Sequence, residues 1–168
     1  MSQESPVSQP AMPQDPSNQN SLDHDLRRLV YYSRNRVAGE PGAMHETIRG
    51  ILAASRTNNA RVGVTGALMF NAGCFAQVLE GPGEAVETTF ERIQQDERHG
   101  EVSLLAFEAV AARLFTDWSM AYVGASQADA ARYGDMANES GFDLSKMTGD
   151  RLCAVLHGLA LEEEAAAA

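Results

Sequence analysis

Lysine is almost absent from this sequence, and positive charge is scarce overall. The 168 residues contain one lysine, Lys146, and only 13 Lys and Arg together against 23 Asp and Glu, so the net charge is −10. A nucleic-acid surface needs Lys and Arg clustered on one face, and a phosphate-binding loop of the Gly-Lys-Ser/Thr type needs a lysine in the motif. We therefore expect no nucleic-acid partner and no phosphate-binding loop of this kind.

Cysteine and long apolar runs are scarce as well. The two cysteines, Cys74 and Cys153, lie far apart among apolar residues, which favours reduced thiols in a cytoplasmic protein over a disulfide scaffold. No apolar run approaches the ~20 residues that a membrane-spanning helix needs, so no membrane partner is expected. The histidines show no ligand-like spacing to one another or to the cysteines, so we expect no metal site.

The first 25 residues differ in composition from the rest of the chain. They carry four of the six prolines, many Ser, Gln and Asn, and neither Lys nor Arg. Such a segment buries too little apolar surface to offset its ordering entropy, so residues 1–25 are predicted to be a disordered tail. The segment has no basic start and no apolar run, and is therefore not a secretory signal.

The remaining sequence alternates between strand-like and helix-like patterns. The strands are predicted from alternation and β-branched or aromatic content at residues 26–34, 62–71, 74–80, 102–111 and 115–123. The helices are predicted from apolar spacing at residues 44–58, 84–97, 125–138 and 147–164. The order β-α-β-β-α-β-β indicates an α+β, ferredoxin-like sandwich with two helices on one face of a five-stranded mixed sheet.

These elements suggest one domain and an extension. We expect a domain over residues 26–125, a helical extension over 126–164 and a short tail over 165–168. The last helix carries an apolar stripe that must be covered, either by the bare face of the sheet or by a second subunit.

Several polar or aromatic residues are not explained by this fold. They are Tyr31 in a strand, Asn58 and Asn59 at the expected end of a helix, Gln77 in a strand, Asp96, Arg98 and His99 at the end of the second helix, and Trp118 and Met120 in the last strand. Taken alone, each has a structural interpretation. Tyr31 can be a core tyrosine, the two asparagines a helix stop and Gln77 a satisfied core amide. The residues at 96–99 can be a solvated helix end, and Trp118 and Met120 can simply pack in the core. A buried amide such as Gln77 needs partners, because leaving one unpaired costs roughly 1–3 kcal/mol.

Five motifs in order give these residues a joint meaning. They are Leu-Val-Tyr-x-Ser at 29–33, Asn-Asn before Gly-Val-Thr-Gly-Ala-Leu at 58–68, Phe-x-Gln-Val-Leu-Glu-Gly at 75–81, Gln-Asp-x-Arg-His at 95–99 and Trp-Ser-Met at 118–120. Together they resemble the BLUF family of blue-light sensors that use FAD. The resemblance covers about residues 26–125. The one visible departure is the loop at 35–43, which looks a few residues longer than is usual in the family.

The resemblance implies a flavin ring between the two helices. Ile51 and Ile93 match the aliphatic residues on either side of the ring, and Asn59 matches the residue at its polar edge. The other expected flavin contacts are Asn58, Gln77, Asp96, Arg98 and His99. This composition suits a flavin, because a flavin has an apolar body and a polar edge.

The resemblance also implies a light switch. Tyr31 and Gln77 match the photochemical pair: Tyr31 supplies an electron and a proton and recovers both, while the Gln77 amide changes its hydrogen bonds by rotation or tautomerisation. Trp118 and Met120 are expected to couple this change to the C-terminal helices. The implied function is a photoreceptor, not an enzyme.

Two alternatives remain from the residues alone. The first is a ferredoxin-like protein-interaction module that has lost flavin binding, and the second, less favoured, is a small-molecule enzyme. Residues 126–168 are too short for an effector domain. We therefore expect the signal to pass to an unknown protein partner, with homo-oligomerisation as a further expectation.

Overall fold

The computed structural model describes residues 25–37, 39–71, 74–123 and 148–168. The strands are β1 (Leu26–Asn35), β2 (Thr65–Asn71), β3 (Cys74–Pro82), β4 (His99–Ala109) and β5 (Ala121–Val123), and the helices are α1 (Pro41–Val62), α2 (Gly83–Gln95) and α4 (Gly149–Ala167). The predicted helix at 125–138 lies outside the described residues. None of the described helices is long and apolar enough to cross a membrane.

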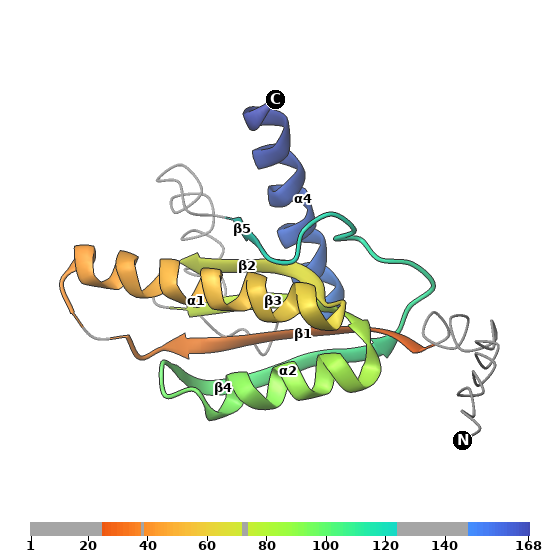
Figure 1. The fold of residues 1–168 in the computed structure, drawn as a ribbon, viewed down its shortest axis with the longest axis horizontal. Coiled ribbons are helices and arrows are strands. Elements are labelled where there is room, and N and C mark those ends of the chain that lie inside the picture. Colours follow the sequence, from red (N-terminus) through yellow and green to blue (C-terminus); the bar gives the residue numbers. More distant parts are fainter. Residues whose placement is uncertain (1–24, 38, 72–73, 124–147) are drawn as a thin grey trace, which may run out of the picture.

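The five strands form one mixed sheet in the order β4-β1-β3-β2-β5. The pairs β1·β4, β1·β3 and β2·β3 are antiparallel, whereas β2 and β5 are parallel. Helices α1 and α2 cover one face of the sheet and α4 lies against the other (Figure 1). The predicted α+β, ferredoxin-like architecture with a five-stranded mixed sheet is therefore confirmed.

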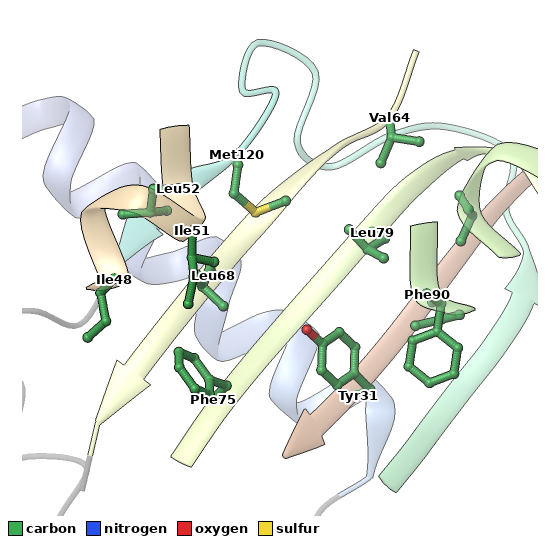
Figure 2. Packing of buried hydrophobic residues seen from close by; sticks show 12 residues of the cluster. Tyr31, Ile48, Ile51, Leu52, Val64, Leu68, Phe75, Leu79, Phe90 and Met120 are labelled. Atoms are coloured by element: carbon green, nitrogen blue, oxygen red, sulfur yellow. The ribbon is translucent and has the colours of Figure 1, made fainter. Parts of the chain in front are cut away.

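Alternation along the strands divides the core into two layers. On β3, Phe75, Gln77 and Leu79 face α1 and α2, while Ala76 and Val78 face α4. Figure 2 shows the first layer, in which side chains of the sheet meet those of α1 and α2.

Helix α4 covers part of the second face of the sheet. Its N-cap Thr148 accepts a hydrogen bond from the backbone N–H of Arg151 at 3.2 Å, which satisfies one of the unpaired donors of the first turn. Leu152, Leu156 and Leu159 are buried against the sheet. The apolar stripe of this helix is thus covered within the chain.

Substituting Leu156 tests this packing. Leu156 is 0% exposed, so Leu156→Ala is expected to lower the free energy of unfolding by about 2–5 kcal/mol. Leu161→Ala on the same helix is the control, because Leu161 is 48% exposed and its loss should change stability by less than about 0.5 kcal/mol. Denaturant unfolding measures both, and equal effects would contradict the packing of α4 on the sheet.

Several predicted boundaries were wrong. Helix α1 does not end at Asn58 and Asn59 but continues to Val62, where Gly63 takes the left-handed conformation (φ 72°) and donates its backbone N–H to the Asn59 carbonyl. Helix α2 ends at Gln95, so Arg98 lies in the following turn and His99 begins β4.

The largest of these differences concerns the last strand. It was predicted over 115–123, but β5 contains only three residues, Ala121–Val123. Trp118 and Met120 therefore lie in the irregular segment before β5, not on a strand. Helix α4 also extends to Ala167, beyond the expected end at residue 164.

Candidate flavin site

A cavity lies between α1, α2 and the sheet. Its volume is about 150 Å³, and it is partly open to solvent. Its lining consists of Ile51, Ala54, Ser55, Asn58, Asn59, Leu68, Gln77, Thr89, Arg92, Ile93, Asp96, Arg98 and His99. Aliphatic side chains from both helices thus face each other across a cavity with a polar rim.

All eight residues predicted to contact a flavin line this one cavity. They come from four elements and the turn between α2 and β4, and include Ile51 on α1 and Ile93 on α2, the two expected to lie on either side of the ring. The structure therefore brings the predicted set together, and the role of each residue toward a flavin stays a prediction. Among the described residues, no group of three or more His, Cys, Asp or Glu is arranged to hold a metal ion.

Sequence reasoning missed five lining residues: Ala54, Ser55, Leu68, Thr89 and Arg92. The helix period could have found four of them. Ser55 follows Ile51 by one helical turn, and Thr89 and Arg92 precede Ile93 and Asp96 on the same face of α2.

Tyr31 and Gln77 are paired across two adjacent strands. The register of β1 and β3 places Tyr31 directly opposite Gln77, and that of β2 and β3 places Leu68 on its other side. The Tyr31 hydroxyl donates a hydrogen bond to Gln77 Oε1. Direct cross-strand partners are close enough for such a bond without any special loop.

The second end of the Gln77 amide contacts Met120. Gln77 Nε2 lies 3.2 Å from Met120 Sδ, as a weak hydrogen bond to the thioether. Tyr31, Gln77 and Met120 are all at least 96% buried. They form a continuous chain of contacts from β1 to the residue before β5, and Figure 2 shows the Tyr31 and Met120 side chains in the same layer.

The backbone around Met120 is held by three successive carbonyls. Trp118 O accepts from the backbone N–H of Gly66 at 3.0 Å, Ser119 O accepts from Asn59 Nδ2 at 3.0 Å and Met120 O accepts from Arg56 Nε at 3.0 Å. Two of the donors belong to α1 and one to β2. Helix α1 therefore fixes both a wall of the cavity and the segment that carries Met120.

Trp118 and Met120 contact opposite layers of the core. Met120 packs with the layer that includes Tyr31, whereas Trp118 is half-buried in the α4 layer with its ring centroid 6.2 Å from that of Phe115. The chain passes from one layer to the other between these two residues.

The polar rim after α2 has a defined charge state. Arg98 Nε donates to Asp96 Oδ1 at 2.8 Å, and this hydrogen bond holds the pKa of the Asp96 carboxyl below its usual value. Burial lowers the pKa of the His99 imidazole, and His99 Nδ1 lies 2.7 Å from Ser33 Oγ. At neutral pH the rim therefore offers a carboxylate, a guanidinium and a neutral imidazole.

Comparison with known proteins agrees with this geometry. The family model described as "Sensors of blue-light using FAD" matches residues 26–121. The chain belongs to the BLUF family. The resemblance found in the motifs is thereby confirmed, and BLUF domains bind FAD.

Solved and curated BLUF proteins are similar over the same region. The dark-state structure of BlrB, a BLUF protein, is 35% identical with a TM-score of 0.66, covering 83% of this chain and 98% of that one. Photoactivated adenylate cyclase subunit beta of Euglena gracilis is 34% identical over 98 residues, which are 57% of this chain and 11% of that protein. The antirepressor BluF of Escherichia coli K12, regulated by blue light and temperature, is 37% identical over 90 residues, which are 54% of this chain and 21% of that protein. The chain thus spans about a tenth of the length of the cyclase subunit.

The cavity fits the flavin of a BLUF domain. Asn59 is 2% exposed. Its Nδ2 donates a hydrogen bond to the Ser119 carbonyl, and its Oδ1 accepts no hydrogen bond from the described residues. A buried amide oxygen without a donor is costly, and a flavin has an N–H in its polar edge that can satisfy it. Ile51, Leu68 and Ile93 supply the apolar walls that the ring body requires.

Replacing Asn59 tests this fit. Asn59→Ala removes the acceptor at the cavity and the donor to Ser119, so we expect weaker FAD retention, by about ten-fold for each net hydrogen bond lost. The control is Thr57→Ala, because Thr57 is exposed on the same helix and does not line the cavity. Flavin release measured by fluorescence during dialysis compares them, and equal retention in Asn59→Ala and wild type would contradict the assignment.

Proposed function

We propose that this BLUF protein is a blue-light photoreceptor in which Tyr31 and Gln77 form the photoactive pair. The observation that supports the proposal most directly is the buried chain Tyr31–Gln77–Met120 beside a cavity lined by all eight predicted contacts. The amide of Gln77 is engaged at both ends, so any change of its orientation must alter two contacts together. The proposed role is that of a sensor and not of an enzyme.

The chemistry is divided between cofactor and chain. Bound FAD would supply absorption of blue light and an excited ring that accepts an electron. Tyr31 is proposed to give an electron and a proton and to recover both, which leaves no net oxidation of the protein. Gln77 is proposed to rotate or tautomerise, exchanging donor and acceptor at the two ends of its amide.

The signal is proposed to leave through the segment before β5. A changed Gln77 amide alters its contact with Met120, whose backbone is held by Arg56 of α1. Trp118, two residues earlier, packs in the α4 layer. We propose that these two residues couple the pair to α4 and then to a protein partner or a second copy of the chain.

A cytoplasmic location is a further part of the proposal. It is supported by Cys74 and Cys153, which are both free thiols, as expected in a reducing compartment.

A light-minus-dark absorption spectrum of the purified protein tests the function. We expect a yellow protein with bound flavin, a small red shift of the flavin band under blue light, and thermal return in darkness. The interaction module without flavin predicts a colourless protein that takes up no added FAD, and this result would refute the photoreceptor proposal. A flavin band that does not shift under blue light would refute the switch.

A further inference from the structure

Glu80 is a buried carboxylate whose partners come from two distant parts of the chain. Its side chain is 0% exposed. Oε1 accepts from Arg28 Nε on β1 at 2.7 Å, and Oε2 accepts from the backbone N–H groups of Leu114 at 2.9 Å and Phe115 at 3.0 Å. A buried charge persists only when it is paired and hydrogen-bonded, and Glu80 is both.

The backbone partners of Glu80 belong to the crossing segment, residues 110–120, which runs from β4 to the start of β5. Arg113 in this segment strengthens the same attachment: Nη1 donates to the Glu80 carbonyl at 3.1 Å and Nη2 to the Gly63 carbonyl at 2.8 Å. Arg28 Nη2 also reaches the Ala112 carbonyl at 3.4 Å. The first half of the crossing segment is thus fixed to the sheet around Glu80.

The second half of the crossing segment contacts the same strand on its other face. Gln77 and Glu80 are three residues apart on β3, so their side chains point to opposite faces. Gln77 contacts Met120 in the α1–α2 layer, whereas Phe115, held by Glu80, packs in the α4 layer. Strand β3 therefore holds both ends of the stretch from Leu114 to Met120.

We propose that Glu80 is a positioning residue for the light switch, an inference that rests on the proposed function. With Leu114 and Phe115 fixed, a change at the Gln77 amide must displace Met120 and the residues next to β5. Without that attachment, only Arg113 holds the first half of the segment, so Leu114 and Phe115 can shift and absorb part of the change. A signal needs an element with two defined arrangements, and Glu80 defines the fixed end of that element.

Two double variants isolate the contact between Glu80 and the crossing segment. Both R28M/E80L and R28M/E80Q remove the two buried charges, so neither leaves an unpaired ion in the core. They differ in one respect: the amide oxygen of the glutamine can still accept from the N–H groups of Leu114 and Phe115, and leucine cannot. Comparison of the two in the full-length, FAD-loaded chain therefore measures this contact.

The first measurement is hydrogen exchange in the dark, which needs no photochemistry. We expect the amides of Leu114 and Phe115 to exchange about ten-fold faster in R28M/E80L than in R28M/E80Q, as for the loss of one hydrogen bond. The flavin content and the dark spectrum should be the same. Equal exchange in the two variants would overturn the inference, because Glu80 would then not hold the crossing segment.

The second measurement is the response to light. In R28M/E80Q, we expect a light-minus-dark difference in exchange at residues 118–123 and wild-type dark recovery. In R28M/E80L, the difference should be lost and the recovery rate changed several-fold. Suppose that Leu114 and Phe115 exchange faster in R28M/E80L but that both variants respond to light as the wild type does. Glu80 then has only a structural role, and the inference is wrong.

Two further outcomes are distinguishable. If R28M/E80L does not fold, E80Q replaces it, because one amide cannot satisfy both Arg28 and the two backbone donors; E87Q, at an exposed position of α2, is then the control. A wild-type protein that shows no red shift overturns the proposed function, and the inference with it. If the wild type and all variants show the red shift, and hydrogen exchange is the same in all of them, only the proposed role of Glu80 is overturned.

Discussion

The Gln77→Leu variant is expected to retain FAD and to lose the light-induced red shift completely. Leucine has a similar size but cannot accept from the Tyr31 hydroxyl or donate to Met120 Sδ, the two contacts that Gln77 makes. FAD is retained because binding is spread over many lining residues. The buried Tyr31 hydroxyl loses its acceptor, so the free energy of unfolding should also fall by about 1–3 kcal/mol.

Light-minus-dark spectra and denaturant unfolding measure these two effects of Gln77→Leu. Gln94→Leu is the control, because Gln94 is exposed on α2 and does not line the cavity. It should keep the full red shift and wild-type stability. A red shift of normal size in Gln77→Leu would show that the amide is not the group that changes.

The Tyr31→Phe variant is expected to bind FAD and to form no red-shifted state. Tyr31 is 0% exposed, and burial raises the pKa of its phenol well above the ordinary value. The phenol is therefore protonated at physiological pH and carries the proton that Tyr31 is proposed to give together with the electron. Phenylalanine keeps the packing against Phe90, whose ring centroid lies 5.3 Å away, but has no such proton to give.

Tyr32→Phe is the matched control for Tyr31→Phe. Tyr32 is the next residue on β1, is half-buried and packs in the α4 layer instead of the cavity layer. Removal of its hydroxyl should leave both the amplitude of the red shift and the dark recovery unchanged. Light-minus-dark spectra of the two variants at equal flavin content decide the assignment: loss in both, or in neither, would contradict it.

Much of the site could be predicted because its residues lie in local motifs. The positions of Gln77 on a strand and of Asp96, Arg98 and His99 directly after a helix follow from patterns within a few residues. The register of β1 against β3, which joins Tyr31 to Gln77, follows from the fold once the strands are paired. All eight predicted contacts therefore line one cavity.

The errors concern residues whose partners are distant in the sequence. Asn58 and Asn59 look like a helix stop, yet α1 continues because Asn59 finds a buried partner in Ser119 and Gly63 supplies the left-handed cap. The apolar residues of 115–123 look like one strand, but Phe115 and Met120 are buried in different layers of the core. Only residues 121–123 pair in a strand ladder, whereas residues 115–120 are held mainly by hydrogen bonds that involve side chains.

Glu80 is another residue whose partners are distant in the sequence and could not be predicted from it. The sequence places it in a motif after Gln77, but its partners are Arg28 and the backbone of Leu114 and Phe115. No local pattern connects these three parts of the chain. These contacts of Glu80 are therefore visible only in the tertiary structure.

The parallel pairing of β2 with β5 joins two segments that are far apart in the sequence. Strands β2 and β3 are neighbours in sequence and can pair early, whereas β5 can join β2 only after β4 and the crossing segment have been made. A pairing over such a distance must first offset a large loop-closure entropy, so we expect it to form after the local β2–β3 hairpin. We therefore expect Asn59 and Gln77 to gain their contacts with Ser119 and Met120 late in folding, so that the cofactor site is completed after most of the sheet.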